Sequence, residues 1–231
     1  MLIFLDVETT GLEEKDMVCS IGIIGVEEKN TTTIYELVNE GKKILSQASS
    51  VNHITNEMLM DKVKFKESQA YKFLTCHNNL DATIIGHNIK FDLAMLEKSG
   101  FSFKGEVIDT LRVTKHLVPE CEQFSLQFLR YELKLYKQEK DELQAHNALS
   151  DATIAKNLYE YLLDFGTKEL LSELSFKKVL ISKFEFGKYS GRYIEEISMC
   201  DRGYLEWMLA NIIDLDEDLR YSIEYYLGEL S

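Results

Sequence analysis

The chain of 231 residues has a single proline and no apolar run near the roughly 18 residues that a membrane-spanning helix needs. Its first residues also lack the charged segment and apolar core of a secretion signal. Polar, low-complexity tracts are absent as well, and hydrophobic residues make up 45% of the chain, which excludes a disordered protein. We therefore expect a soluble, cytoplasmic, packed globular protein that does not bind membranes.

Cysteines are few and scattered. They stand at positions 19, 76, 121 and 200 and form no C-x-x-C pair. Such spacing fits neither a structural zinc site nor a disulfide framework. We expect reduced thiols that serve packing.

Positive charge is scarce, with 26 basic against 39 acidic residues and a net charge of −13. This balance argues against a broad surface that binds phosphates without specificity. Residues 177–192 are a local exception, because they contain five basic side chains and only one acid, Glu185. A run of charge is usually no more than a solvated face, so this segment alone indicates little.

The order of apolar segments predicts strands alternating with helices. Strands are expected at 2–7, 18–26 and 31–38, and within "ATIIGHN" and "GEVIDT". A short helical turn should follow Thr55, and longer helices are expected at 65–79, in "FDLAMLEKSG" and "TLRVTKHLV", and at 124–134 and 147–165. This order predicts an α/β layer fold with a mixed sheet.

The composition changes towards the C-terminus. A polar stretch around Gly166 indicates a boundary, and from about residue 175 the chain becomes rich in Tyr, Phe, Lys and Gly. We predict a first domain of residues 1–168 and a small second module of residues 175–231.

Acidic residues stand at the ends of the predicted strands and the starts of the predicted helices. Asp6 and Glu8 alternate with apolar residues, so both should point to one side of the first strand. Asp92 and Asp151 each lie near the start of a helix. Clefts of α/β sheets form at such places, and four acids in one cleft would need a cation.

Hard oxygen ligands suit Mg²⁺ or Mn²⁺ better than zinc. Two such ions roughly 3.5–4 Å apart can support phosphodiester hydrolysis. This chemistry also needs a base, for which His146, five residues before Asp151, is the candidate. Taken singly, each acid could instead be solvated or favoured by a helix dipole, and His146 could be an ordinary exposed histidine.

Three segments together resemble the motifs of the DEDD exonucleases, in the subclass whose third motif carries histidine. They are "FLDVETTGL", "HNIKFDLAML" and "HNALSDA", in the family's order, and "VNHIT" and "VIDTLRVTKHLVP" resemble the segments that accompany them. The resemblance spans residues 1 to about 165. It implies a ribonuclease H-like fold, a five-stranded mixed sheet flanked by helices, followed here by a small, mostly helical C-terminal module.

The resemblance also implies roles for the site residues. Asp6, Glu8 and Asp151 would bind the first of two Mg²⁺ or Mn²⁺ ions, Asp6 would also touch the second, and Asp92 would act largely through water. His146 would be the base.

Substrate contacts are implied in the same way. Thr9, Thr10 and Gly11 would contact the 3′-terminal nucleotide, and Leu12 would wedge between the last bases. His53 would lie beside the terminal nucleotide and Asn88 near the next phosphate or base.

The C-terminal stretch "FEFGKYSGRYIEEI", followed by "YLEW", resembles the small module of exonuclease X-like proteins. Lys188 and Arg192 would then be nucleic-acid or partner contacts. They are preferred to Trp207 as contacts, since a lone Trp at helical spacing is usually buried. Equally open is a helical hairpin in which Tyr204 and Trp207 form the module's own small core.

These features predict a metal-dependent 3′–5′ exonuclease that acts on the free 3′ ends of nucleic acid, with a role in DNA repair or replication. DNA is favoured over RNA, as single strands or frayed ends, with release of nucleoside 5′-monophosphates. One alternative is a proofreading subunit that works with a DNA polymerase. Another is a non-catalytic nucleic-acid-binding module, which the presence of all four acids and the histidine disfavours.

Overall fold

The computed structural model describes residues 1–13, 15–28, 30–139 and 143–228. The chain divides into two compact units, residues 1–175 and residues 176–231. No helix in the described ranges is both long and apolar enough to cross a membrane.

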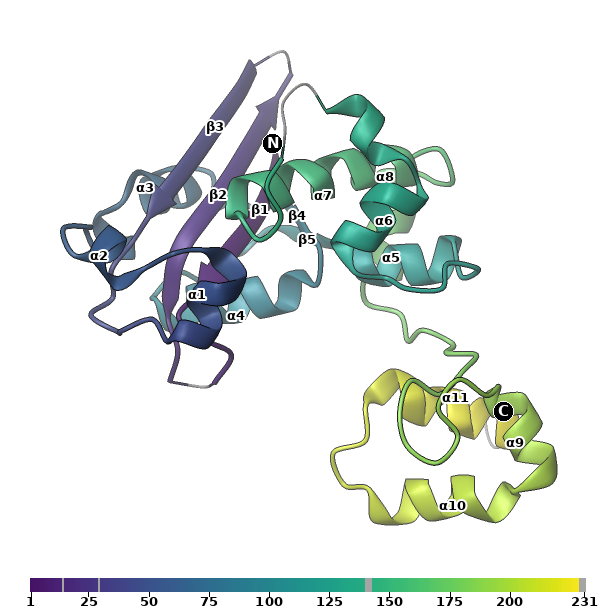
Figure 1. Ribbon diagram of the computed structural model, residues 1–231. Helices are drawn as coiled ribbons and strands as arrows, with labels where there is room; N and C mark the ends of the chain where they lie inside the picture. Colours follow the sequence, from purple (N-terminus) through teal and green to yellow (C-terminus); the bar gives the residue numbers. More distant parts are fainter. Residues whose placement is uncertain (14, 29, 140–142, 229–231) are drawn as a thin grey trace. The chain divides into compact units, whose positions relative to one another are not determined.

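The first unit is built on a five-stranded sheet (Figure 1). Its strands are β1 (Leu2–Thr9), β2 (Val18–Glu27), β3 (Asn30–Leu37), β4 (Thr83–Gly86) and β5 (Glu106–Asp109). In the order β3-β2-β1-β4-β5, the first three strands pair antiparallel and β1, β4 and β5 pair parallel. The predicted five-stranded mixed sheet is confirmed.

The central strand β1 is buried on both faces, as its nearly continuous apolar run requires. Ile3, Leu5 and Val7 join a core with α3 (Gln69–Cys76) and α4 (Ile89–Lys98). On the opposite face Phe4 packs edge-on against Tyr159 of α7 (Ala148–Leu162), with 5.6 Å between ring centroids. Because side chains alternate along a strand, Asp6 and Glu8 share the face of Phe4, under α7.

The helices of the Phe4 face are α5 (Thr110–Leu117), α6 (Leu126–Glu132), α7 (Ala148–Leu162) and α8 (Lys168–Leu174), which contribute to one apolar cluster. The chain between β3 and α3 contains the short helices α1 (Ser46–Asn52) and α2 (Asn56–Leu59). Single 3₁₀ turns, η1 (Phe65–Glu67) and η2 (Leu135–Gln138), precede α3 and follow α6.

One expectation about the helices was wrong. The single helix expected over 65–79 is broken at Ser68, whose extended backbone and hydroxyl cap α3 by accepting from the Tyr71 N–H at 3.0 Å. The first unit runs to Ser175 and includes α8, whose Leu171 and Leu174 join the Phe4-face cluster. The sequence analysis further missed α1.

The second unit consists of α9 (Ile194–Cys200), α10 (Arg202–Asn211) and α11 (Glu217–Leu227), preceded by an irregular segment. Its own apolar core gathers Phe184, Ile194, Leu205 and Ile223 among others. The mostly helical module that the sequence suggested is thus what the chain forms.

Candidate active site

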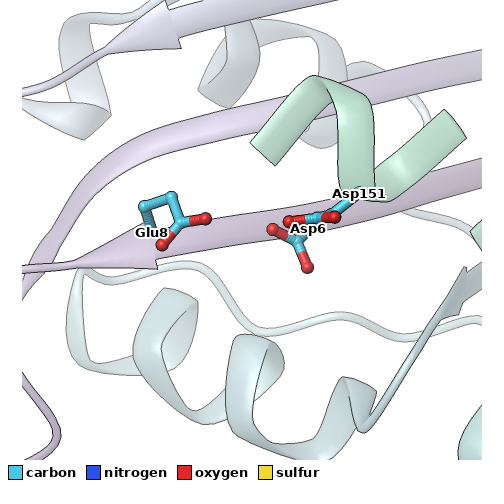
Figure 2. A group of neighbouring side chains, drawn as sticks. All are labelled: Asp6, Glu8 and Asp151. Atoms are coloured by element: carbon cyan, nitrogen blue, oxygen red, sulfur yellow. The ribbon is translucent and has the colours of Figure 1, made fainter. Parts of the chain in front are cut away.

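Three carboxylates meet where β1 passes under the start of α7 (Figure 2). Asp6 and Glu8 project from β1 and Asp151 from the first turn of α7. One oxygen of each lies within 4.8 Å of the others. The structure therefore brings together three of the four acids that the sequence analysis placed in one site.

A glycine allows this approach. Gly22 of β2 lies opposite Asp6 in the antiparallel register. A Cβ at this position would lie 2.3 Å from the backbone of Ala148 and Leu149 in the first turn of α7. The α7 N-terminus therefore packs directly on the backbone of β2. This contact determines how closely Asp151 approaches Asp6.

Asp92 enters the site differently. It lies in the first turn of α4, is buried, and accepts a hydrogen bond from the Val7 N–H at 2.9 Å. The pairing of β1 with β4 ends at Phe4 and Ile85, so Asp92 supplies an acceptor to β1 beyond the end of that pairing. Asp92 lies outside the group of three ligand oxygens, although its charge acts on Asp6.

Burial and mutual repulsion make the charged state of these acids unfavourable. The pKa of Asp6 is raised well above its ordinary value, first by burial and then by the charges of Asp92, Asp151 and Glu8. Burial, reinforced by Asp151, raises the pKa of Glu8 to about 8, and burial raises the pKa of Asp92 to about 8. A divalent cation would reverse this cost, and the all-oxygen donor set suits a hard ion such as Mg²⁺ or Mn²⁺.

His146 is exposed and stands two residues before α7. Burial raises the pKa of Asp151. The charge of the His146 ring and a hydrogen bond with the His146 backbone both oppose that rise, so His146 lies close to Asp151. The predicted base is thus beside the carboxylate cluster but outside it.

Three predicted site residues share an uncommon backbone conformation. A positive φ is found at His53 (60°), Asn88 (61°) and His146 (57°), and residues other than glycine rarely adopt it. They end α1, begin α4 and precede α7, and all three side chains are exposed. Strained backbone of this kind concentrates at functional sites.

The turn after β1 is held by its own side chains. The Thr9 hydroxyl donates to the Gly11 carbonyl at 2.6 Å, and the Thr10 hydroxyl donates to Asp16 at 3.0 Å. Both threonines are buried, whereas Leu12 is 86% exposed. Of the predicted substrate contacts on this turn, Leu12 is therefore the side chain presented to solvent.

Two residues of the site were missed by sequence reasoning. Asn52 donates to the Thr9 carbonyl at 3.2 Å and hydrogen-bonds Glu8, which opposes the rise of the Glu8 pKa. Gln127 of α6 donates to Asp151 Oδ1 at 2.8 Å. Asn52 stands beside His53 in a segment that was singled out, but no pattern in the sequence marked Gln127.

In the second unit, the predicted contacts are paired internally. Lys188 forms an ion pair with Asp201 at 3.0 Å, and Arg192 pairs with Glu196 one helical turn away. Trp207 is 53% exposed and stacks on Tyr204, so the expectation that it is buried was wrong. Tyr204 does pack against the unit's apolar core.

Comparison with known proteins gives two family matches. A family described as Exonuclease matches residues 3–159, and one described as Exodeoxyribonuclease X-like C-terminal matches residues 184–212. Exodeoxyribonuclease 10 of Escherichia coli K12 is 27% identical over 98% of this chain and 99% of its own. DNA polymerase III subunit epsilon of Rickettsia prowazekii is 30% identical over 68% of this chain and 71% of its own.

Solved structures agree on the fold. Exonuclease X in complex with 5′ overhanging duplex DNA superimposes with a TM-score of 0.62 at 24% identity, over 76% of this chain and 99% of that one. E. coli Exonuclease I in complex with a dA16 oligonucleotide gives a TM-score of 0.56 at 17% identity, over 74% and 42%.

Proposed function

The chain belongs to the exonuclease family, and from this premise we propose that it removes nucleotides from the 3′ ends of DNA with the help of two Mg²⁺ ions. It is an enzyme of the 3′–5′ exonuclease class. The observation that carries the proposal is the meeting of Asp6, Glu8 and Asp151 within 4.8 Å. A relative that matches along nearly the whole chain is named as an exodeoxyribonuclease, which favours DNA over RNA.

The donor set fits the proposed ions. Asp6, Glu8 and Asp151 would bind the first Mg²⁺, with Mn²⁺ as a substitute, and Asp6 would also touch the second. Asp92 accepts a hydrogen bond from the Val7 N–H and would act largely through bound water. When bound, such ions stabilise the negative charge that develops on the phosphate and its leaving oxygen.

The residues around the cluster would handle the proton and the substrate. His146 would take a proton from the attacking water, which its exposure and its interaction with Asp151 support. Leu12, on the turn formed by Thr9, Thr10 and Gly11, would wedge between the last bases. His53 and Asn88, both exposed, would contact the terminal nucleotide and its neighbour. The product would be a nucleoside 5′-monophosphate.

We propose a supporting nucleic-acid contact in the second unit at Lys188 and Arg192. Their internal ion pairs with Asp201 and Glu196 are exposed to solvent, where water and salt screen the attraction and the pairs add little to stability. A phosphate could therefore displace an acid as the partner of either cation at little cost.

A second candidate is a proofreading subunit that acts with a DNA polymerase, supported by the match to the polymerase III epsilon subunit. That match covers 68% of the chain, whereas the exodeoxyribonuclease match covers 98%. Size-exclusion chromatography with a purified polymerase separates the two: co-elution supports the subunit, and separate elution with full activity supports an independent enzyme.

The function is tested by digesting 5′-labelled single-stranded DNA and RNA of one sequence, with Mg²⁺ or with a chelator, and with Asp151→Asn as the inactive control. We expect a ladder that shortens from the 3′ end, is faster on DNA, and is lost with the chelator and in the variant. Tight binding without any ladder on either strand would instead identify a non-catalytic binding module.

A further inference from the structure

A chain of partly to fully buried polar side chains reaches Asp151. It runs from Glu139 through Arg130 to Gln127, whose amide donates to Asp151 Oδ1 at 2.8 Å. Gln127 and Arg130 lie on α6, three residues apart and so on the same face of the helix. Neither has a role in the proposed chemistry described above.

The orientation of the Gln127 amide is fixed by Arg130. Arg130 Nη1 donates to Gln127 Oε1 at 3.2 Å, and a guanidinium can only donate hydrogen bonds. The amide oxygen must therefore face Arg130, and the amide nitrogen must face Asp151. In a flipped amide the NH₂ group would face the Arg130 guanidinium, which is also a donor, and the amide oxygen would face the Asp151 carboxylate, which is also an acceptor.

Arg130 is itself held in place. Its Nε and Nη2 donate to the two carboxylate oxygens of Glu139 at 2.8 and 2.6 Å, in the bidentate geometry that fixes a guanidinium plane. The side chains of this pair are only 9% and 6% exposed. Nη1 also donates to the Leu143 carbonyl at 3.4 Å. Arg130 thus holds residues on the stretch that leads to His146.

We propose that Gln127, locked by the Arg130–Glu139 pair, is a positioning residue that orients the Asp151 carboxylate for divalent-metal binding. The inference rests on the proposed role of Asp151 as a metal ligand. Hydrogen bonds to the free parts of a ligating side chain fix its orientation, and losing one typically costs about 10–100-fold in metal affinity or activity.

The test is calorimetric titration of Mn²⁺ into the metal-free full-length protein, which reports metal binding without any turnover. Gln127→Leu removes both hydrogen bonds at nearly constant volume. We expect its Mn²⁺ dissociation constant to rise about 10–100-fold, with hydrolysis partly restored at raised Mn²⁺. Gln123→Leu, at an exposed position just before α6, is the matched control and should bind like the wild type.

Arg130→Lys keeps the positive charge but cannot hold Glu139 and Gln127 together, so it should weaken Mn²⁺ binding in the same direction. It is preferable to Arg130→Ala, which would leave Glu139 buried without a partner. Thermal unfolding in chelator checks that each variant is folded.

Asp151→Asn separates this inference from the proposed function. If Asp151→Asn weakens Mn²⁺ binding and folded Gln127→Leu does not, the positioning role of Gln127 is refuted and the metal site stands. If Asp151→Asn leaves Mn²⁺ binding unchanged, the metal-ligand role is refuted and this inference falls with it.

Discussion

Replacing Gly22 by alanine should separate Asp151 from Asp6 and Glu8 without touching any of them. The added Cβ would lie 2.3 Å from the Ala148 carbonyl group and the Leu149 nitrogen, all backbone atoms of the first turn of α7. Carbon atoms normally approach to about 3.5–4 Å, so this turn must move by roughly 1 Å or more. Asp151 lies in the same turn and must move with it.

The consequences of that shift can be estimated. Overpacking of this kind costs about 1–3 kcal/mol of unfolding free energy. For a chain of this length, each kcal/mol lowers the melting temperature by roughly 2–4 °C. A displacement of about 1 Å within a catalytic site can cost about 100-fold in rate. We therefore expect kcat/KM on single-stranded DNA to fall about 100-fold in a protein that is still folded at 25 °C.

Gly25→Ala is the matched control on the same strand. Gly25 lies three residues after Gly22 on β2, so an added Cβ would face away from α7. This Cβ would lie 2.4 Å from the ring tip of Phe73. This variant should lose stability yet keep its kcat/KM. Equal kcat/KM in Gly22→Ala and the wild type would refute the argument that this backbone contact positions Asp151.

Other predictions concern pH, the base and the exposed turn. In chelator, the melting temperature should fall as the pH rises from about 5 to about 9, because the pKa values of Glu8 and Asp92 are raised to about 8 and the folded state favours their protonated forms. Mg²⁺ should remove most of this decrease. If the melting temperatures in chelator and in Mg²⁺ differed by the same amount at every pH, the electrostatic argument would be contradicted. His146→Ala should lower kcat by about 10²–10⁴-fold and leave Mn²⁺ affinity unchanged in calorimetry, since its side chain is outside the oxygen cluster; a parallel loss of Mn²⁺ binding would make it a metal ligand instead. Leu12→Ala should raise KM for DNA while changing the unfolding free energy by less than about 0.5 kcal/mol, because the side chain is 86% exposed; an unchanged KM would remove Leu12 from the substrate site.

The sequence predicted those features that depend on local patterns. Alternation along β1 placed Asp6 and Glu8 on one face, and the structure has them there, under α7. The five-stranded mixed sheet followed from the family resemblance and from the order of strands and helices. Alternation is determined within a few residues, which is why the pattern sufficed for Asp6 and Glu8. The sheet pairs distant strands such as β1 and β4, so predicting it needed the family resemblance as well.

Other features depend on contacts between distant segments and could not be read from the sequence. Asp92 binds the Val7 N–H across 85 positions, and Gln127 meets Asp151 across 24. The prediction of one helix over 65–79 was wrong for a local reason. Ser68 caps α3 instead of continuing the helix that the apolar periodicity indicated. Trp207 is exposed because α10 buries Leu205 and Met208 instead.

The central claim is that Asp6, Glu8 and Asp151 bind the divalent ions on which hydrolysis depends. It is tested most directly by an anomalous difference map from crystals of the active protein grown with Mn²⁺. We expect at least one strong peak at coordination distance from the carboxylate oxygens of all three residues, and the loss of that peak in Asp6→Asn. Mn²⁺ peaks only at other positions in crystals of active enzyme, or an unchanged peak in Asp6→Asn, would contradict it.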